Sequence, residues 1–294
     1  MEAGITAFIK AILIIQNQFN IFYPEYGNIR LFGLLFIMVR YAVLGSGSCG
    51  NSYIFQNENG SILVDAGYSC REIIRRMEAC GFTSDCLNGI FITHTHSDHF
   101  RGVEVLARKL SVPVYLHGKL DRQSLFTNPP EKIISISGTD PVEIAGFRLY
   151  PFKTNHDSPH SISFSVVHDE LSFSIITDTG KTDDKMLAAA ADSDILFLEA
   201  NYDPEMLRKG PYHYNLKKRI ASARGHLSND DAVRFVNDIH LTENSKLKKV
   251  YFCHLSGTNN HPDLLERRLK EHLLWPGEWT VCRKGEPVND HGQD

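Results

Sequence analysis

The stretch THTHSDH, residues 93–99, contains four side chains of the types that bind metal ions, which are His94, His96, Asp98 and His99. It directly follows GIFIT, whose apolar character predicts a buried strand. Because side chains alternate along an extended segment, the first two histidines can point to one side. The aspartate and the last histidine turn toward a second point as the chain enters a helix. The spacing therefore predicts a centre for two metal ions, and a solvated loop rich in histidine is the alternative.

Three more apolar runs end near a residue that can bind a metal. FRLYPFK leads to His156, LSFSIIT to Asp178 and KVYFC to His254. In open sheets, functional groups lie at the strand ends. The three residues that follow these runs are therefore predicted to share one cleft. Imidazole and carboxylate ligands without thiolate suit zinc, manganese or iron, which leaves the identity of the metal open. Taken singly, a core histidine or a capping aspartate is the alternative for each residue.

The order of apolar and amphipathic stretches predicts an α/β fold. Strands are predicted for YAVLG, SYIFQ, SILVDAG, GIFIT, VPVYLH, KIISI, FRLYPFK, SISFSVV, LSFSIIT, DILFLEA and KVYFCH. Helices are predicted for REIIRRMEACG, FRGVEVLARKL, DKMLAAAA and SNDDAVRFVNDIH, with Gly81 ending the first and Ser228 capping the last. Two sheets packed face to face with helices outside would accommodate this order.

Composition limits the class of protein. With 294 residues, 42% of them hydrophobic, the chain can bury a sizeable core. The 31 basic and 35 acidic residues give no overall positive charge that would mark a nucleic-acid binder, although a local basic patch can still form. Six scattered cysteines without a CxxC pair indicate reduced thiols, so we expect a cytoplasmic protein.

Residues 1–37 differ from the rest of the chain. Their apolar runs AILIIQNQFNIFY and LFGLLFIMV fall short of the roughly 18 to 20 apolar residues that a membrane span needs, so no stable span is expected. A compact domain begins at RYAVLGSGSCGNSY. We therefore expect an accessory or non-native extension over residues 1–37 and one hydrolase domain over residues 38–294, with Met38 as the natural start.

HTHSDH matches the HxHxDH signature of the metallo-β-lactamase superfamily, and His156, TDTG and His254 follow in the expected order. From about Val39 to the C-terminus the sequence resembles this superfamily. The resemblance implies an αββα sandwich of two mixed sheets flanked by helices. It also implies one metal ion held by His94, His96 and His156, a second held by Asp98, His99 and His254, and Asp178 as a bridge between them.

The resemblance implies a binuclear metal-dependent hydrolase that uses two divalent ions, zinc or manganese. A hydroxide held between two cations is a nucleophile at neutral pH, because the metals lower the pKa of bound water. Asp98 could orient that hydroxide. Redox members of the superfamily usually carry Glu in place of the second histidine of the motif, so His96 favours hydrolysis.

Motifs on either side of these residues narrow the range of possible substrates. GSGSCGNS, LEANYD, GPYHYNLKKRIASARGHLSNDDA and CHLSGTNN are similar to those of the YycJ (WalJ) family of exonucleases. That resemblance implies a 5′→3′ exonuclease whose substrate is DNA, single-stranded or at a 5′ end, with a role in DNA repair. No inserted clamp domain of the kind found in some nuclease relatives is recognisable.

The order of LEAN, GHLS and a strand ending in histidine also resembles tRNA 3′-processing nucleases of the superfamily. In those enzymes the corresponding histidine assists departure of the leaving group. By that comparison His226 is a candidate general acid and Glu199 its orienting partner. A residue that merely precedes the Ser228 cap is the alternative for His226.

Basic and amide side chains supply candidate substrate contacts. Those predicted are Lys217, Lys218 and Arg219 of YHYNLKKR, and Asn259 and Asn260 of SGTNN. Cations can follow a phosphate backbone while the neighbouring tyrosines stack on bases. A solvated helix face and an ordinary turn are the respective alternatives.

Two other functions compete with the exonuclease. One is a small-molecule phosphodiesterase, such as one that opens cyclic phosphates on phosphoribosyl substrates. The other is a non-catalytic binding module on the same fold, against which seven candidate ligands argue. GSGSCGNS lacks the GxxxxGK(S/T) pattern, so a tight turn and no nucleotide cofactor are expected. The oligomeric state is left open.

Overall fold

A computed structural model describes residues 39–289. The predicted extension over residues 1–37 lies outside the described residues. Of the helices within residues 39–289, none is long and apolar enough to cross a membrane.

The described chain forms two seven-stranded sheets. The first has the order β14 (Val288–Asn289), β1 (Arg40–Gly45), β2 (Ser52–Asn57), β3 (Gly60–Val64), β4 (Leu87–Phe91), β5 (Val114–His117) and β6 (Ile133–Ile136). The second has the order β13 (Glu278–Val281), β12 (Lys249–Cys253), β11 (Ile195–Glu199), β10 (Leu171–Ile176), β9 (Ile162–His168), β8 (Phe147–Lys153) and β7 (Val142–Ile144). Both sheets are mixed, since β3 to β6 and β10 to β13 pair in parallel whereas the neighbouring hairpins are antiparallel.

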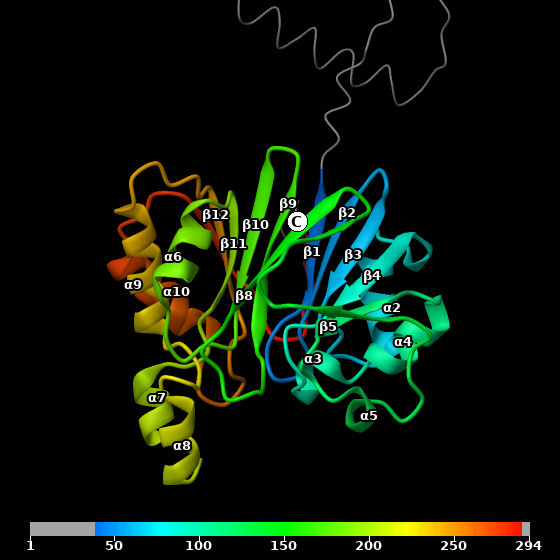
Figure 1. Cartoon of the computed structure of the whole chain (residues 1–294). Coiled ribbons are helices and arrows are strands. Elements are labelled where there is room, and N and C mark those ends of the chain that lie inside the picture. Colours follow the sequence, from blue (N-terminus) through cyan, green and yellow to red (C-terminus); the bar gives the residue numbers. More distant parts are fainter. Residues whose placement is uncertain (1–38, 290–294) are drawn as a thin grey trace, which may run out of the picture. The chain divides into compact units, whose positions relative to one another are not determined.

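The two sheets pack face to face around an aromatic core (Figure 1). Phe55 of β2 contacts Phe173 of β10 with ring centroids 4.9 Å apart, and Phe91 of β4 contacts Phe164 of β9 at 5.7 Å. Each such pair contributes about 0.5–1.5 kcal/mol beyond the burial of its area. These contacts fix the spacing of the sheets and therefore the distance between their strand ends.

Helices cover the outer face of each sheet (Figure 1). The first sheet is flanked by α2 (Cys70–Ala79), α3 (Ser97–Phe100), α4 (Val103–Leu110) and α5 (Arg122–Leu125), with a short 3-10 turn at Ser84–Cys86. The second is flanked by α6 (Asp184–Ala191), α9 (Asn229–His240) and α10 (Pro262–His272), and α7 (Pro204–Lys209) and α8 (Tyr214–Ile220) follow β11. The predicted α/β sandwich of two mixed sheets with helices outside is confirmed.

Some element boundaries differ from the sequence prediction. GIFIT ends as a strand at Phe91, two residues before Thr93, and FRGVEVLARKL is divided between α3 and α4. Gly102 lies at the division, where a glycine is needed because a Cβ would lie 2.0 Å from the carbonyl oxygen of Tyr68. The short segments β7, β13, β14 and α5 and the helices α7, α8 and α10 were not predicted.

Candidate metal centre

The predicted ligands meet where strands of both sheets end. His94 and His96 lie in the segment after β4, and His156 follows β8 by three residues. Asp178 lies two residues beyond β10, and His254 directly follows β12. The backbone therefore brings together residues that are up to 160 positions apart in the sequence.

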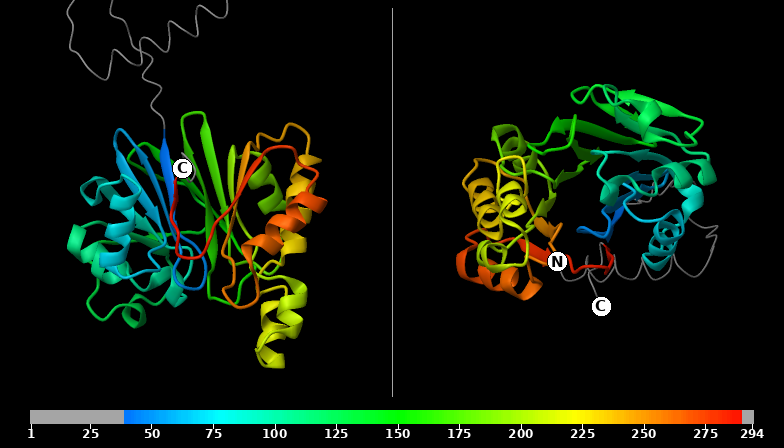
Figure 2. Two further views of the ribbon diagram at one scale, coloured as in Figure 1. Left: turned by 180° about the vertical axis from the view of Figure 1, so that it is seen from behind. Right: turned by 90° about the horizontal axis from the view of Figure 1, so that it is seen from below.

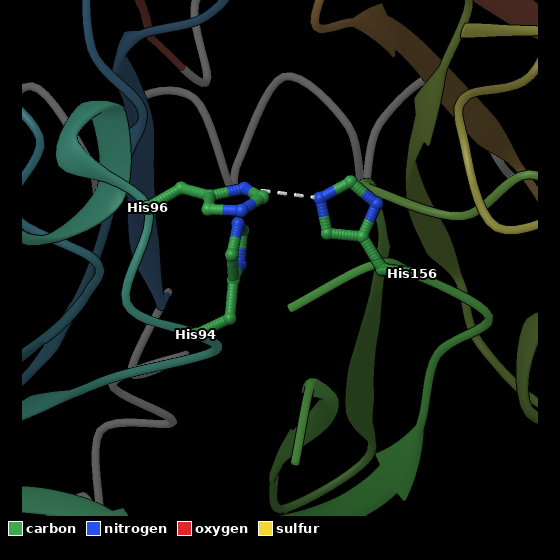
Figure 3. Close-up of side chains that lie close together, drawn as sticks. All are labelled: His94, His96 and His156. Atoms are coloured by element: carbon green, nitrogen blue, oxygen red, sulfur yellow. Dashed lines mark hydrogen bonds between the residues drawn. The ribbon is translucent and has the colours of Figure 1, made fainter. Parts of the chain in front are cut away.

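Three histidines form the first cluster, which Figure 3 shows. His94, His96 and His156 each offer a ring nitrogen, and these atoms lie within 4.8 Å of one another. His156 Nε2 is 3.2 Å from His96 Nδ1. Three imidazoles converging in this way match the ligand set predicted for the first metal ion.

Asp98, His99 and His254 form the second cluster, again with ligand atoms within 4.8 Å. Asp178 lies between the two clusters. Its Oδ2 is 3.1 Å from His99 Nε2, and its Oδ1 is 3.6 Å from both His254 Nε2 and His156 Nε2. A carboxylate in this place can reach a cation in either cluster, as expected of a bridging residue.

Two buried nitrogens indicate that the clusters fit metal ions. His94 Nε2 and His254 Nε2 are buried and have no hydrogen-bond partner among residues 39–289. Buried polar atoms are normally paired, so one unpaired imidazole nitrogen in each of the two clusters needs an explanation. Coordination to a cation supplies one. The nitrogen and oxygen donors suit zinc, manganese or iron.

The opposite ring nitrogens are held by the protein. His99 Nδ1 is 2.7 Å from Asp65 Oδ2, His254 Nδ1 is 2.8 Å from Glu199 Oε1, and His156 Nδ1 is 3.1 Å from the carbonyl oxygen of Gly225. Such contacts fix the tautomer that leaves Nε2 free and keep the ring aimed at the site.

Asp65 was not singled out from the sequence, although it lies within the predicted strand SILVDAG and directly follows β3. Its carboxylate accepts hydrogen bonds from the amide and the hydroxyl of Thr93, at 2.9 and 2.8 Å, besides holding His99. Asp65 is fully buried. It thus anchors both the start and the end of THTHSDH.

The turn GSGSCGNS also reaches the site. Asn51 Nδ2 lies 2.9 Å from His99 Nε2, and the amide of Asn51 donates to the carbonyl oxygen of Asp98 at 2.7 Å. Asn51 is a second residue that the sequence did not single out. The turn joins β1 and β2, as predicted.

Three residues at the candidate metal centre have a strained backbone conformation. Asp65, Asp178 and His254 have φ values of 62°, 55° and 58°, in the left-handed region that favours glycine. Each such residue costs on the order of 1–3 kcal/mol and persists where surrounding contacts enforce it. All three directly follow or closely follow a strand, so strain here aims side chains from the strand ends into one point.

Buried histidines and carboxylates shift one another's pKa values in the two clusters. Burial alone would lower the pKa of His99, but the carboxylates of Asp178 and Asp65 outweigh it and raise that pKa to about 10. For Asp178, burial is outweighed by the charges of His254 and His99, which hold its pKa well below the usual value. Burial, reinforced by His99, holds the pKa of His94 well below its usual value. The carboxylates therefore favour positive charge here, and a divalent cation would displace the protons.

Glu199 and His226 lie beside the second cluster. His226 Nδ1 is 2.7 Å from Glu199 Oε1, while the other oxygen of Glu199 accepts from the amides of Thr179 and Leu227, each at 3.1 Å. Burial alone would lower the pKa of His226, but the negative charge of Glu199 outweighs it and raises that pKa. The structure thus brings the two residues into contact, and their roles as acid and orienting partner stay a prediction.

A cleft of about 340 Å³ opens beside the clusters. Asp98, Asp178, His226 and His254 line one side of it, and Tyr212, Leu216 and Ile220 from α8 and its approach line another. α7 and α8 project beyond the end of the second sheet, at the end where α3 lies on the first (Figures 1 and 2).

The predicted substrate contacts occupy different places. Arg219 and Asn259 line this cleft, and Arg219 forms an ion pair with Asp157, the neighbour of His156. Lys217 and Lys218 line a separate groove beside α8. Asn260 is buried with its amide bonded inside the protein and does not line the cleft.

The sequence is similar to that of known proteins over most of the described residues. Residues 61–255 match the family model described as the β-lactamase superfamily domain. The chain is 33% identical over 247 residues to the exodeoxyribonuclease WalJ of Streptococcus pneumoniae serotype 2, which covers 80% of this chain and 88% of the relative. It is 32% identical over 238 residues to the exodeoxyribonuclease YycJ of Bacillus anthracis, covering 80% and 89%.

Among solved structures, the metallo-β-lactamase fold protein YhfI of Bacillus subtilis is similar with a TM-score of 0.66. The alignment covers 85% of this chain and 99% of YhfI at 19% sequence identity. At that identity the likeness concerns the fold alone.

Proposed function

The chain belongs to the metallo-β-lactamase superfamily and, within it, to the family of the WalJ and YycJ exodeoxyribonucleases; from that premise we propose that it digests DNA from the 5′ end. The resemblance found in the sequence is thereby confirmed, and the chain is a metal-dependent phosphodiester hydrolase. Direction of digestion, choice of DNA and residue roles are parts of the proposal.

The observation that carries the proposal is the contact between Glu199 and His226 beside Asp178. Glu199 occupies Nδ1 of His226, so Nε2 is the nitrogen left to serve the cleft that His226 lines. A buried carboxylate that raises the pKa of an imidazole lets it stay protonated to higher pH than a free imidazole. His226 is therefore placed to give a proton to the departing sugar oxygen.

Two divalent cations, zinc or manganese, would be held by His94, His96 and His156 on one side and Asp98, His99 and His254 on the other, with Asp178 between them. When bound, they would activate water and neutralise phosphoryl oxygens. Asp98 lies on the cleft side of the second cluster and could orient the attacking water. Asp65 and Glu199 keep the ligand imidazoles in the required tautomer.

The surface beside the cleft supports a nucleic-acid substrate. Arg219 at the cleft can pair with a phosphate in exchange for Asp157, and the exposed Lys218 continues the positive charge along α8. Tyr214 leaves 76% of its surface exposed on the same helix, and an exposed aromatic ring offers a stacking face for a base. Helix α8 would thus follow a single strand that leads away from the centre.

The experiment offers the manganese-loaded or zinc-loaded protein four substrates in parallel: a single-stranded DNA, an RNA of the same sequence, a cyclic phosphate ester and a β-lactam. Preferred hydrolysis of the DNA supports the proposal. Hydrolysis of the cyclic ester alone would replace it with the small-molecule phosphodiesterase. Hydrolysis of none, with metal bound, would favour a binding module.

We also propose that residues 38–294 suffice for this activity and that the setting is the cytoplasm. The seven candidate ligands and the core between the two sheets lie within residues 39–289. A protein that begins at Met38 should therefore fold and bind metal as the full chain does, and failure of either would show that residues 1–37 are needed.

A further inference from the structure

Asn259 is a buried residue whose side-chain amide has no hydrogen-bond partner among the described residues. It leaves 1% of its surface exposed, yet neither its Nδ2 nor its Oδ1 is hydrogen-bonded within residues 39–289. Leaving a buried donor or acceptor unpaired destabilises a protein, because the group loses its hydrogen bonds to water and gains none in return. An amide unpaired at both ends is therefore expensive unless another molecule completes it.

The backbone of Asn259 is, in contrast, fixed at both ends. Its amide donates to Ser256 Oγ at 3.1 Å, and its carbonyl oxygen accepts from the amide of Asp203 at 2.8 Å. Gly210 packs so closely that a Cβ there would lie 2.8 Å from Asn259 Oδ1. The side chain is thus held in place without being paired.

The next residue shows what a structural asparagine looks like in the same turn. Asn260 Nδ2 donates to the carbonyl oxygen of Ala200 and to Asn229 Oδ1, each at 2.8 Å. Its Oδ1 accepts from Asn229 Nδ2 at 3.0 Å and from the amide of His261 at 2.9 Å. The two adjacent asparagines therefore differ: Asn260 ties the turn together, whereas Asn259 lines the cleft with its amide unpaired among residues 39–289.

The cleft that Asn259 lines has the size and the walls for one nucleoside. Its volume of about 340 Å³ is at the lower end of the roughly 300–1,000 Å³ found for small-molecule sites. Tyr212, Leu216 and Ile220 give it an apolar wall, which suits the faces of a base. Asp178 and His254 line the same cleft, so a phosphate near the metal clusters would place its nucleoside between these walls.

We infer that Asn259 determines substrate specificity by hydrogen bonding a neutral group of the terminal nucleoside, one that both donates and accepts. This inference rests on the proposed nuclease function and names the part of the substrate that Asn259 would contact. A sugar hydroxyl and the edge of a base share that chemistry. Inorganic phosphate lacks a nucleoside and should not depend on Asn259.

The test compares the metal-loaded full chain with its Asn259→Leu variant, in which an apolar group of similar shape replaces the amide. Calorimetry gives the dissociation constants of a deoxynucleoside 5′-monophosphate, deoxyribose 5-phosphate and inorganic phosphate. We expect the variant to bind the nucleotide about 10-fold more weakly, which corresponds to loss of one to two hydrogen bonds. A loss shared by deoxyribose 5-phosphate points to the sugar, and a loss confined to the nucleotide points to the base.

Thermal unfolding separates this role from a structural one. Replacing an unpaired amide by leucine should leave the melting temperature unchanged or raise it, whereas Asn260→Leu, the matched control, should lower it because four hydrogen bonds are lost. Equal nucleotide affinity in wild type and Asn259→Leu would overturn the inference, as would a fall in melting temperature with equal loss for all three ligands. Nucleotide binding that depends on Asn259 without any digestion of DNA would reject the proposed function and leave this inference standing.

Discussion

Glu199 Oε1 lies 2.7 Å from Nδ1 of His226 and 2.8 Å from Nδ1 of His254. One buried carboxylate oxygen therefore holds two imidazoles, of which one belongs to a predicted metal cluster and the other faces the cleft. The position of the proposed acid is tied in this way to the position of the metals. This coupling leads to the first two predictions.

The loss of activity in His226→Ala should depend on the leaving group of the substrate. Departure of a sugar alkoxide from DNA needs a proton, so we expect a loss of about 100-fold to 10,000-fold in kcat on DNA. A 4-nitrophenolate needs no proton, so the loss on bis(4-nitrophenyl) phosphate should be much smaller. The two rates are measured on protein of equal metal content. Equal losses on both substrates would exclude a role as general acid.

The pH profile should reflect the protonated form of His226. Because Glu199 outweighs burial and raises the pKa of His226, the acid form persists to higher pH than in a free imidazole and is lost as the pH rises through that pKa. We therefore expect kcat/KM on DNA to fall on the alkaline side, and the fall to move to lower pH in Glu199→Gln. An alkaline limb that stays in place in this variant would contradict the assignment.

Asp65→Asn should weaken metal binding without leaving a cavity in the protein interior. The amide keeps the size and tolerates the positive φ, but it removes the carboxylate that His99 Nδ1 faces at 2.7 Å. Loss of such an outer contact typically costs about 10-fold to 100-fold in metal affinity, which competition with a chelator measures. Asp194→Asn is the matched control. Asp194 is also a buried aspartate, but it directly precedes β11, at the end of that strand away from Glu199 and the metal centre. Equal effects of both variants would show a general loss of stability instead.

Lys218→Glu should weaken binding of single-stranded DNA and flatten its salt dependence. Each lost phosphate contact on a single strand lowers the slope of log K against log salt by about 0.7. Filter binding or fluorescence anisotropy over a salt series gives this slope. The same change at Lys270, which is exposed on α10, is the control. If both variants change the slope alike, net charge and not α8 is responsible.

The sequence predicted much of this arrangement because its signals are local. Buried runs such as KVYFC form strands wherever they occur in a sandwich, and a residue directly after such a run arrives at the sheet edge. His156, Asp178 and His254 could therefore be placed in one cleft from their position after strands. The motif around His96 supplied the superfamily and with it the fold.

Other features depend on contacts between distant residues. Asp65 holds His99 across 34 positions, and nothing in the local pattern of SILVDAG distinguishes it from a turn residue. Asn259 and Asn260 are neighbours of one type, so only their tertiary partners separate them. The sequence grouped Lys218 with Arg219, yet the two line different grooves beside α8.

Digestion of one single-stranded DNA labelled either at its 5′ end or at its 3′ end tests the proposed activity most directly. The metal-loaded full chain is compared with Asp178→Asn, which removes a charge shared by both clusters. We expect the 5′ label to leave first as a mononucleotide while strands carrying the 3′ label shorten progressively, with neither event in the variant. Early loss of the 3′ label, internal fragments, or equal rates with Asp178→Asn would contradict a metal-dependent 5′→3′ exonuclease.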